Sequence, residues 1–239
     1  MTIKIIEPHS IILTPKSEVQ DMPRRIELAG RTCYKSEDKI TEESSDKFCR
    51  NIIKRGHESV LEHCSITVKI VCDRACSHQL VRHRLAAYSQ ESQRYCDYSS
   101  KKHGSSGLEV VCPPSITRYD VDMNKWLSAV EGAYRTYLWL RGEEIAAEDA
   151  RSVLPNATKT EVVTTLNIRQ WRHVFSSAPT GRAFNKHAQW QIKGLMQGVW
   201  CELVKAAPSL FNDLECSFKM DPFSCHWLED TFGNEADRG

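Results

Sequence analysis

The sequence lacks long apolar runs and an excess of either charge. No apolar stretch approaches the length of a membrane span, and the first residues, MTIKIIEPHS, are too polar for a secretory signal. Lysine and arginine total 32 against 31 for aspartate and glutamate, so the basic excess of proteins that bind nucleic-acid polymers is missing. These absences predict a soluble, cytoplasmic protein that binds neither a membrane nor a nucleic-acid polymer.

The spacings of common metal and dinucleotide motifs are also missing. The chain has ten cysteines but no Cys-x-x-Cys pair, and Cys72 with Cys76 has no second pair to complete a zinc site. Without a secretory context, reduced thiols are expected rather than disulfides. No Gly-x-Gly-x-x-Gly run occurs. We therefore predict no metal, and Cys225 beside His226 leaves a thiol nucleophile open as an alternative.

Residue periodicity predicts a mixture of helices and strands. Apolar residues spaced three and four apart predict helices over 17–35, 41–56, 74–82, 121–145, 147–154, from near 167, and over 185–206. Alternating β-branched residues predict strands over 63–72 and 161–166. Thr41 and Asp73 are expected to cap helices, and the polar residues 96–109 to form a loop. The aromatic residues of 121–145 are expected in the core.

Length and composition bound the domain organisation. At 239 residues the chain suits one domain, or one domain with an appendage. After Leu214 carboxylates outnumber basic residues. This shift predicts a main domain over 1–213 and an acidic C-terminal appendage over 214–239, outside the main core.

The densest cluster of polar side chains lies at residues 82–95, RHRLAAYSQESQRY. Its arginines are always charged and rigidly forked, so they favour a phosphate or carboxylate partner. If the preceding helix continues, Gln79 and Arg82 share one of its faces. In an extended segment Arg82 and Arg84 lie on one side and His83 on the other. The alternative is a solvated face paired with nearby acids, but the density of the cluster favours a binding site.

Ser92 and Arg94 stand two residues apart in this cluster. An extended loop would place the hydroxyl beside the guanidinium, which suits phosphate binding. Ser92 as a nucleophile activated by His83 is an alternative. Nothing in the spacing guarantees hydrogen-bond reach between those two side chains, so we predict a binding serine.

Two further clusters allow more than one interpretation. In HESVLEH at 57–63 the histidines are six apart, unlike the helical zinc-protease pattern. Ser59 and Glu62 there suit either a capping box or a ligand role. Residues 151–191 carry amides, guanidiniums and imidazoles that could bind a heterocycle and its phosphate, or form an ordinary polar helix face.

Arg82-His83-Arg84, followed after seven residues by Ser92, resembles the signature of the flavin-dependent thymidylate synthases. HESVLEH at 57–63 resembles the upstream motif of that family, and residues 150–155 its middle motif. Residues 167–169 and 188–192 resemble its late helices. The resemblance covers residues 20–205, in order and at near-family spacing.

The resemblance implies an enzyme that methylates a pyrimidine nucleotide. The implied reaction is reductive methylation of dUMP to dTMP, with methylenetetrahydrofolate as one-carbon donor, NADPH as reductant and FAD as cofactor. The implied fold is α+β, with long helices around an antiparallel sheet, and residues 1–213 would be the catalytic domain. The implied assembly is a homotetramer with active sites shared between subunits.

The resemblance also implies roles for individual residues. The nucleotide-holding positions are Gln79, Arg82, Gln90, Glu91, Ser92, Arg94, Arg151 and Arg182. The flavin-contacting positions are Cys33, Ser59, Glu62, Arg82, His83, Arg84, Asn167, Arg169 and His187. Catalytic roles are assigned to His57, Ser92 and Arg182, with Ser92 binding the nucleotide rather than attacking it. His57 and Tyr95 lie where the family manages folate access.

Three departures from the family pattern keep other functions open. Gln90 stands where the family usually has Glu, with the carboxylate moved to Glu91, and Ala87 and Ser89 replace a usual Ser and Asn. In an extended loop, a one-residue shift sends a side chain to the opposite side. The connection before Arg182 is longer than usual. The alternatives are dCMP as acceptor, a hydroxymethyl product, or a non-catalytic nucleotide-binding protein.

Overall fold

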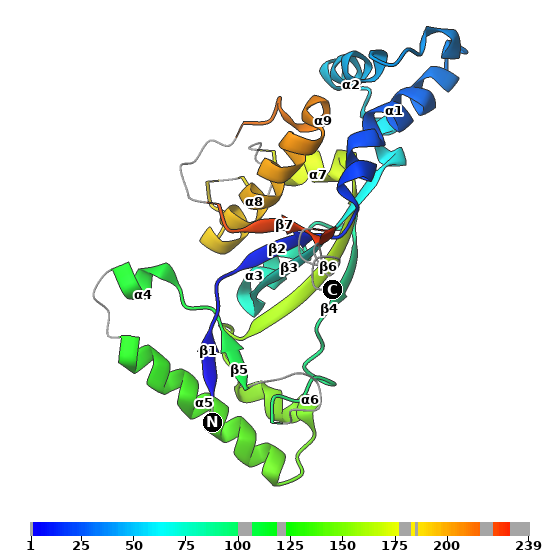
Figure 1. Cartoon of the computed structure of the whole chain (residues 1–239). Helices are drawn as coiled ribbons and strands as arrows, with labels where there is room; N and C mark the ends of the chain where they lie inside the picture. The colour runs from blue at the N-terminus through cyan, green and yellow to red at the C-terminus, as the bar shows by residue number, and fades with distance from the viewer. Residues whose placement is uncertain are drawn as a thin grey trace, which may run out of the picture. The chain divides into compact units, whose positions relative to one another are not determined.

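The computed structural model describes residues 2–99, 107–118, 123–176, 183–184, 186–215 and 222–229. The chain divides into two compact units. Unit 1 comprises Met1–Pro8, Val71–His78 and Gln90–Val162, and unit 2 comprises His9–Ile70, Gln79–Ser89 and Val163–Gly239. Figure 1 colours their elements by residue number. Each unit gathers segments that are far apart in the sequence, and the division of the chain at 213/214 stays a prediction.

The strands form two sheets. The larger has five strands in the order β4 (Ala87–Gln90), β6 (Lys159–Asn167), β3 (Ser65–Asp73), β2 (His9–Ile12) and β7 (Cys225–Trp227). The smaller pairs β1 (Ile3–Ile5) with β5 (Leu108–Val110). The β2–β7 and β1–β5 pairs run parallel.

The two long strands, β3 and β6, run antiparallel. The Ile168 amide donates to the Cys64 carbonyl at 2.9 Å, and the Arg74 amide donates to the Thr158 carbonyl at 3.0 Å. The early residues of one strand therefore meet the late residues of the other. Buried and partly exposed residues alternate along β6, as the period of two predicts. Both predicted strands are confirmed, and so is the α+β class with its antiparallel-rich sheet.

Between β2 and β3 the chain forms α1 (Lys16–Thr32), the 3-10 turn η1 (Glu37–Lys39), α2 (Ser44–Lys54) and the 3-10 segment η2 (Glu58–His63). The predicted ranges 17–35 and 41–56 are confirmed to within a few residues, but the predicted Thr41 cap is wrong. The residue before α2 is Glu43, without a side-chain cap. The Thr41 amide instead donates to Ser44 Oγ at 2.9 Å, so its partner is a side chain inside the helix.

Two helix starts follow the local sequence closely. Asp73 Oδ1 accepts from the Cys76 amide at 2.6 Å at the start of α3 (Arg74–Leu80), which confirms the predicted cap. Asn167 caps α7 (Ile168–Val174) by accepting from the Gln170 amide at 2.8 Å. Both side-chain oxygens satisfy an amide that has no partner inside its helix.

The late helices of unit 2 are α8 (Trp190–Ala206) and α9 (Pro208–Phe211). Helix α8 packs on β2 and β7, as Figure 1 shows. A Cβ on Gly194 would lie 2.5 Å from the Phe223 ring, so the absence of a side chain there admits the segment leading into β7. The predicted helix 185–206 begins later, because Gln189 caps it by accepting from the Gln191 amide at 2.8 Å.

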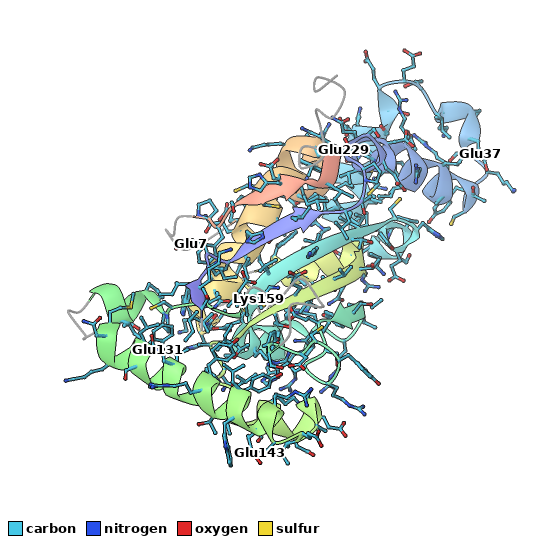
Figure 2. All side chains as sticks on the ribbon, turned by 60° about the horizontal axis from the view of Figure 1, so that its bottom comes forward. Glu7, Glu37, Glu131, Glu143, Lys159 and Glu229 are labelled. Atoms are coloured by element: carbon cyan, nitrogen blue, oxygen red, sulfur yellow. The ribbon has the colours of Figure 1, made fainter. Side chains whose placement is uncertain are left out.

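Strand β7 lies in the acidic segment that the sequence assigned to an appendage. Trp227 is 2% exposed, and its Nε1 donates to Glu202 Oε2 at 3.1 Å. Glu229, labelled in Figure 2, accepts from the backbone amide of Lys16 at 2.8 Å. Residues 222–229 therefore complete the five-stranded sheet, and for them the expected place outside the core is wrong.

Unit 1 contains α4 (Pro114–Arg118), α5 (Met123–Gly142), α6 (Ala147–Ala150) and the 3-10 turn η4 (Arg151–Val153). Val130, Tyr134 and Tyr137 of α5 are buried in one cluster with Leu108 and Val110 of β5, which confirms that these residues of the helix face the core. For Trp139, at 62% exposure, the expected place in the core is wrong. Residues 107–109 lie in the range 96–109 predicted as a loop, but 108 and 109 belong to β5, and residues 100–106 lie outside the described part. None of the helices in the described part is long and apolar enough to cross a membrane.

Candidate functional site

The Arg82-His83-Arg84 segment of unit 2 follows α3 and shows the predicted alternation. Arg82 and Arg84 are exposed, whereas His83 is 3% exposed and its Nδ1 lies 2.9 Å from the Leu80 carbonyl oxygen. The Tyr88 hydroxyl donates to the carbonyls of Leu80 and His83 at 2.9 and 2.8 Å. The two guanidiniums are therefore presented on a segment that buried contacts hold in place.

Two cavities of unit 2 bring together most residues predicted to contact flavin. A cavity of about 950 Å³ is lined by Cys33, His57, Ser59 and Arg169. A second, of about 700 Å³, is lined by Glu62, Asn167 and Arg169. Arg169 lines both cavities, so they adjoin. The structure thus assembles this group from three segments of the sequence.

Arg169 is held by two carboxylates. Its Nη1 donates to Glu62 Oε1 at 2.6 Å, and its Nε lies 3.6 Å from Glu58 Oε2. Glu62 and Glu58 raise the pKa of the Arg169 guanidinium through that hydrogen bond and their charges. The capping box suggested by Ser59 and Glu62 is not formed, because η2 has His57 at its start and no side-chain cap. Glu62 instead orients a cation.

Two further predicted residues of unit 2 lie around the start of α8. Gln79 Oε1 accepts from the Gln189 amide at 3.4 Å. His187 is exposed. Arg182, predicted to bind the nucleotide and act in catalysis, lies outside the described residues.

In unit 1 the predicted phosphate-binding arginines meet at one residue. Arg94 Nε donates to Glu148 Oε2 at 2.8 Å, and Arg151 Nε donates to the Glu148 carbonyl oxygen at 3.1 Å. Ser92 Oγ accepts from the Arg94 amide at 3.3 Å, and the Arg94 guanidinium lies 5.6 Å from the centre of the exposed Tyr95 ring. Ser92, Arg94 and Arg151 are therefore linked to one another through the Arg94 backbone amide and through Glu148.

Gln90 and Glu91 have separate sets of partners, as the alternation of an extended segment requires. Gln90 Nε2 donates to Ser77 Oγ at 3.0 Å and to Thr160 Oγ1 at 3.2 Å. Glu91 Oε1 accepts from the Tyr98 hydroxyl at 2.9 Å, and Glu91 Oε2 lies 3.3 Å from Lys159 Nζ.

Lys159, labelled in Figure 2, joins three carboxylates. Its Nζ lies 2.6 Å from Glu161, 3.3 Å from Glu91 and 3.7 Å from Glu109, and its side chain is 15% exposed. Burial alone lowers the pKa of Lys159, but its hydrogen bond to Glu161 and the charges of these acids outweigh that effect and raise it. Glu91 is therefore part of a half-buried charge cluster.

Sequence reasoning missed Glu148, Lys159 and Tyr98. Glu148 carries a weak local signal, since it stands three residues before Arg151 in the same helical segment. Lys159 and Tyr98 carry no such signal, because the contact of each with Glu91 forms only when the chain has folded.

The thiol nucleophile suggested by Cys225-His226 is disfavoured. Burial raises the pKa of Cys225 to about 12, so the thiolate is scarce at neutral pH. Within the described part of the chain, the cysteines are free thiols and no group of three or more His, Cys, Asp or Glu is arranged to hold a metal ion.

The order of these segments along the chain is that of a known enzyme family. Residues 17–209 match the family described as thymidylate synthase complementing protein (Thy1). The chain belongs to this family, the flavin-dependent thymidylate synthases.

Relatives with the name flavin-dependent thymidylate synthase occur in several bacteria. The protein of Geobacter sulfurreducens is 36% identical over 200 residues, covering 81% of this chain and 82% of the relative. That of Mycolicibacterium vanbaalenii is 36% identical over 208 residues, covering 80% and 78%. That of Mycobacterium tuberculosis is 34% identical over 218 residues, covering 83% and 82%.

A solved structure shows the same fold. The UMP/dUMP methylase PolB from Streptomyces cacaoi, solved with 5-Br dUMP, superposes with a TM-score of 0.69 at 20% sequence identity. The match covers 89% of this chain and 96% of that chain.

Proposed function

We propose that this protein methylates dUMP to dTMP, using methylenetetrahydrofolate as one-carbon donor, NADPH as reductant and FAD as cofactor. Family membership supports the reaction class. The single observation that carries the nucleotide site is the meeting of Arg94 and Arg151 at Glu148, beside Ser92. Guanidiniums and a hydroxyl held this way suit a nucleotide phosphate.

The residues of unit 2 fit a flavin dinucleotide. FAD is elongated, and the two adjoining cavities share Arg169. Their lining offers a guanidinium, the Ser59 hydroxyl and the Asn167 amide, which are donors for phosphate and ring atoms. When bound, FAD supplies the hydride and handles the one-carbon unit. In our proposal Arg84 and Arg169 hold its charged part, and the buried His83 fixes the segment that presents Arg84.

Gln90 supports uracil as the base. Its amide nitrogen donates to Ser77 and Thr160, which leaves the carbonyl oxygen as the acceptor of that side chain. An acceptor pairs with the N3–H of uracil, whereas N3 of cytosine carries no hydrogen. The name UMP/dUMP methylase of the Streptomyces cacaoi protein agrees with a uracil nucleotide. We therefore prefer dUMP to dCMP.

The remaining roles follow the family resemblance. Ser92 and Arg182 bind the nucleotide, and His57 controls folate access at the larger cavity, which it lines. The protein acts as a homotetramer in the cytoplasm, with active sites shared between subunits. These assignments are part of the same proposal.

The colour of the purified protein is the first test. Protein that takes up FAD is yellow, and NADPH bleaches it without air. Incubation with methylenetetrahydrofolate and either dUMP or dCMP, followed by mass measurement of the nucleotide, then identifies the acceptor and the product. A methyl gain on dCMP alone contradicts the proposed substrate, a hydroxymethyl gain contradicts the proposed product, and failure to bind FAD contradicts the enzyme proposal.

A further inference from the structure

Helix α2 presents a row of polar side chains to the larger cavity of unit 2. Lys47, Asn51 and Arg55 stand four residues apart, so they follow one face of the helix and its last turn. All three line the cavity of about 950 Å³. At 1.5 Å per residue, the row extends over about 12 Å. We call these three residues the α2 row.

The charge of the cavity lining is strongly positive. Arg31 and Arg169 have acidic partners, at 2.8 Å from Glu27 and 2.6 Å from Glu62 respectively. Within the described part of the chain, no carboxylate lies within 4.0 Å of Lys39, Lys47 or Arg55, which line the same cavity. Three cations there have no acidic partner, so the cavity favours an anionic ligand.

The arrangement of these cations favours an extended ligand. A compact anion such as phosphate needs donors that converge on one point. The α2 row instead spreads two cations and an amide along the helix, beside Phe48 and Ile52, which also line the cavity. A chain with a carboxylate at each repeat can pair with successive donors of such a row.

One end of the α2 row lies next to His57, the residue that we propose controls folate access. Arg55 is separated from His57 only by Gly56, whose φ of 71° turns the chain between α2 and η2. Arg55 and His57 line the same cavity. If His57 stands at the folate entrance, the far end of a bound folate can lie along α2.

We propose that the α2 row binds the oligo-γ-glutamate tail of the folate co-substrate, with Asn51 and the two cations pairing with successive carboxylates. Lys39 extends the positive surface beyond Lys47. The inference rests on the proposed function, because folate enters only through it. It adds a subsite for the part of the co-substrate that takes no part in the chemistry.

A matched pair of charge reversals tests the inference. The test variant carries Lys47→Glu and Arg55→Glu. The control carries Arg50→Glu and Lys54→Glu, which are exposed residues of the same helix that do not line the cavity. Both variants change the net charge equally. Thermal unfolding checks that each is folded, and Lys47→Gln with Arg55→Gln replaces the test variant if it is not.

The measurements compare folates with one and five glutamates. We expect the unchanged protein and the control to show a KM about tenfold lower for pentaglutamyl than for monoglutamyl methylenetetrahydrofolate. In the test variant this ratio falls to about one. Calorimetric titration of the FAD-loaded protein with pentaglutamyl and monoglutamyl tetrahydrofolate should show the same loss of preference. In the unchanged protein, added salt should weaken the pentaglutamyl complex more than the monoglutamyl complex.

Other outcomes separate the inference from the proposed function. Equal KM values for the two folates, with normal dTMP formation, overturn the inference and leave the function intact. An unchanged ratio in the test variant, together with weaker FAD binding or a raised KM for NADPH, also overturns it, because the row would then serve the flavin or the reductant. If no dTMP forms at all, the proposed function fails, and the calorimetric preference alone decides whether the row binds the tail.

Discussion

Arg94 and Glu148 form an ion pair in unit 1, with Nε and Oε2 2.8 Å apart, and Glu148 also accepts from Arg151 through its backbone carbonyl. Both side chains of the pair are about half exposed, at 54% and 47%. Such a pair contributes less than about 1 kcal/mol to stability. Its importance is positional, because Glu148 holds the two arginines of the proposed phosphate site beside one another.

Removing Arg94 should weaken nucleotide binding more than it affects folding. We expect Arg94→Ala to raise the KM for dUMP about 10- to 100-fold, because a charge-assisted contact to the phosphate is lost. Steady-state kinetics and a thermal melt measure the two effects. Arg135→Ala, an exposed arginine on α5, is the matched control. Equal KM values in the two variants would contradict the assignment of Arg94.

Lys159 should be important for the stability of unit 1. We expect Lys159→Gln to lower the free energy of unfolding by about 3 kcal/mol, because three carboxylates within 4 Å of its ammonium lose their shared cation. Urea unfolding measures the loss. Lys159→Arg keeps the charge and should recover most of the stability. If Lys159→Gln unfolds at the same urea concentration as the unchanged protein, the cluster is not stabilising.

Asp97 should make the stability of unit 1 sensitive to acid. Burial raises the pKa of its carboxyl, but hydrogen bonds from Arg141, Ser99 and Tyr137 outweigh burial and lower the pKa well below 3.8. Because the pKa of Asp97 is lower in the folded state, the ionised carboxylate stabilises the fold. This stabilisation is fully present at pH values above the pKa of the unfolded state, which is about 3.9. This stability is lost as the pH falls toward the folded-state pKa.

Asp97→Asn isolates this contribution. We expect the variant to be less stable than the unchanged protein at pH 7 by about 2 kcal/mol, and the difference to shrink steadily below pH 4. Urea unfolding at several pH values between 3 and 7 follows it. A difference that does not vary with pH would show that the Asp97 charge is not linked to folding.

Trp227 should be essential to the sheet of unit 2. Trp227→Ala removes a side chain that is 2% exposed, together with its hydrogen bond to Glu202, and should cost about 3–5 kcal/mol. Trp139→Ala, at 62% exposure on α5, is the control and should cost less than about 1 kcal/mol. Similar melting temperatures for the two variants would show that β7 is dispensable.

Sequence was most informative where the interactions are local. The Asp73 and Asn167 caps involve amides three residues away. The Asp73 cap was predicted from its residue type at the start of a helix, and for Asn167 the helix start near residue 167 was predicted. The alternation of exposed Arg82 and Arg84 with buried His83 followed from backbone geometry alone. The resemblance to the family signature supplied the predicted nucleotide and flavin residues, which periodicity could not.

Sequence was least informative where partners come from distant segments. Glu91 was read as a departure from the family pattern, but its contacts with Lys159 and Tyr98 required the fold. The acidic composition after Leu214 suggested an appendage, because composition cannot reveal that a short strand pairs with β2. The Thr41 cap failed because α2 begins only at Ser44, after Glu43, and Thr41 contacts the helix through its backbone amide, which donates to Ser44 Oγ.

The parallel pairing of β2 with β7 affects how the chain is made. On the ribosome Ser10 emerges early, whereas its partner Cys225 is added after nearly all other residues that the structure describes. Contacts between such distant segments slow folding, because a long loop must close first. Until then one edge of β2 stays open to pairing with other chains, so nascent unit 2 is a candidate substrate for chaperones.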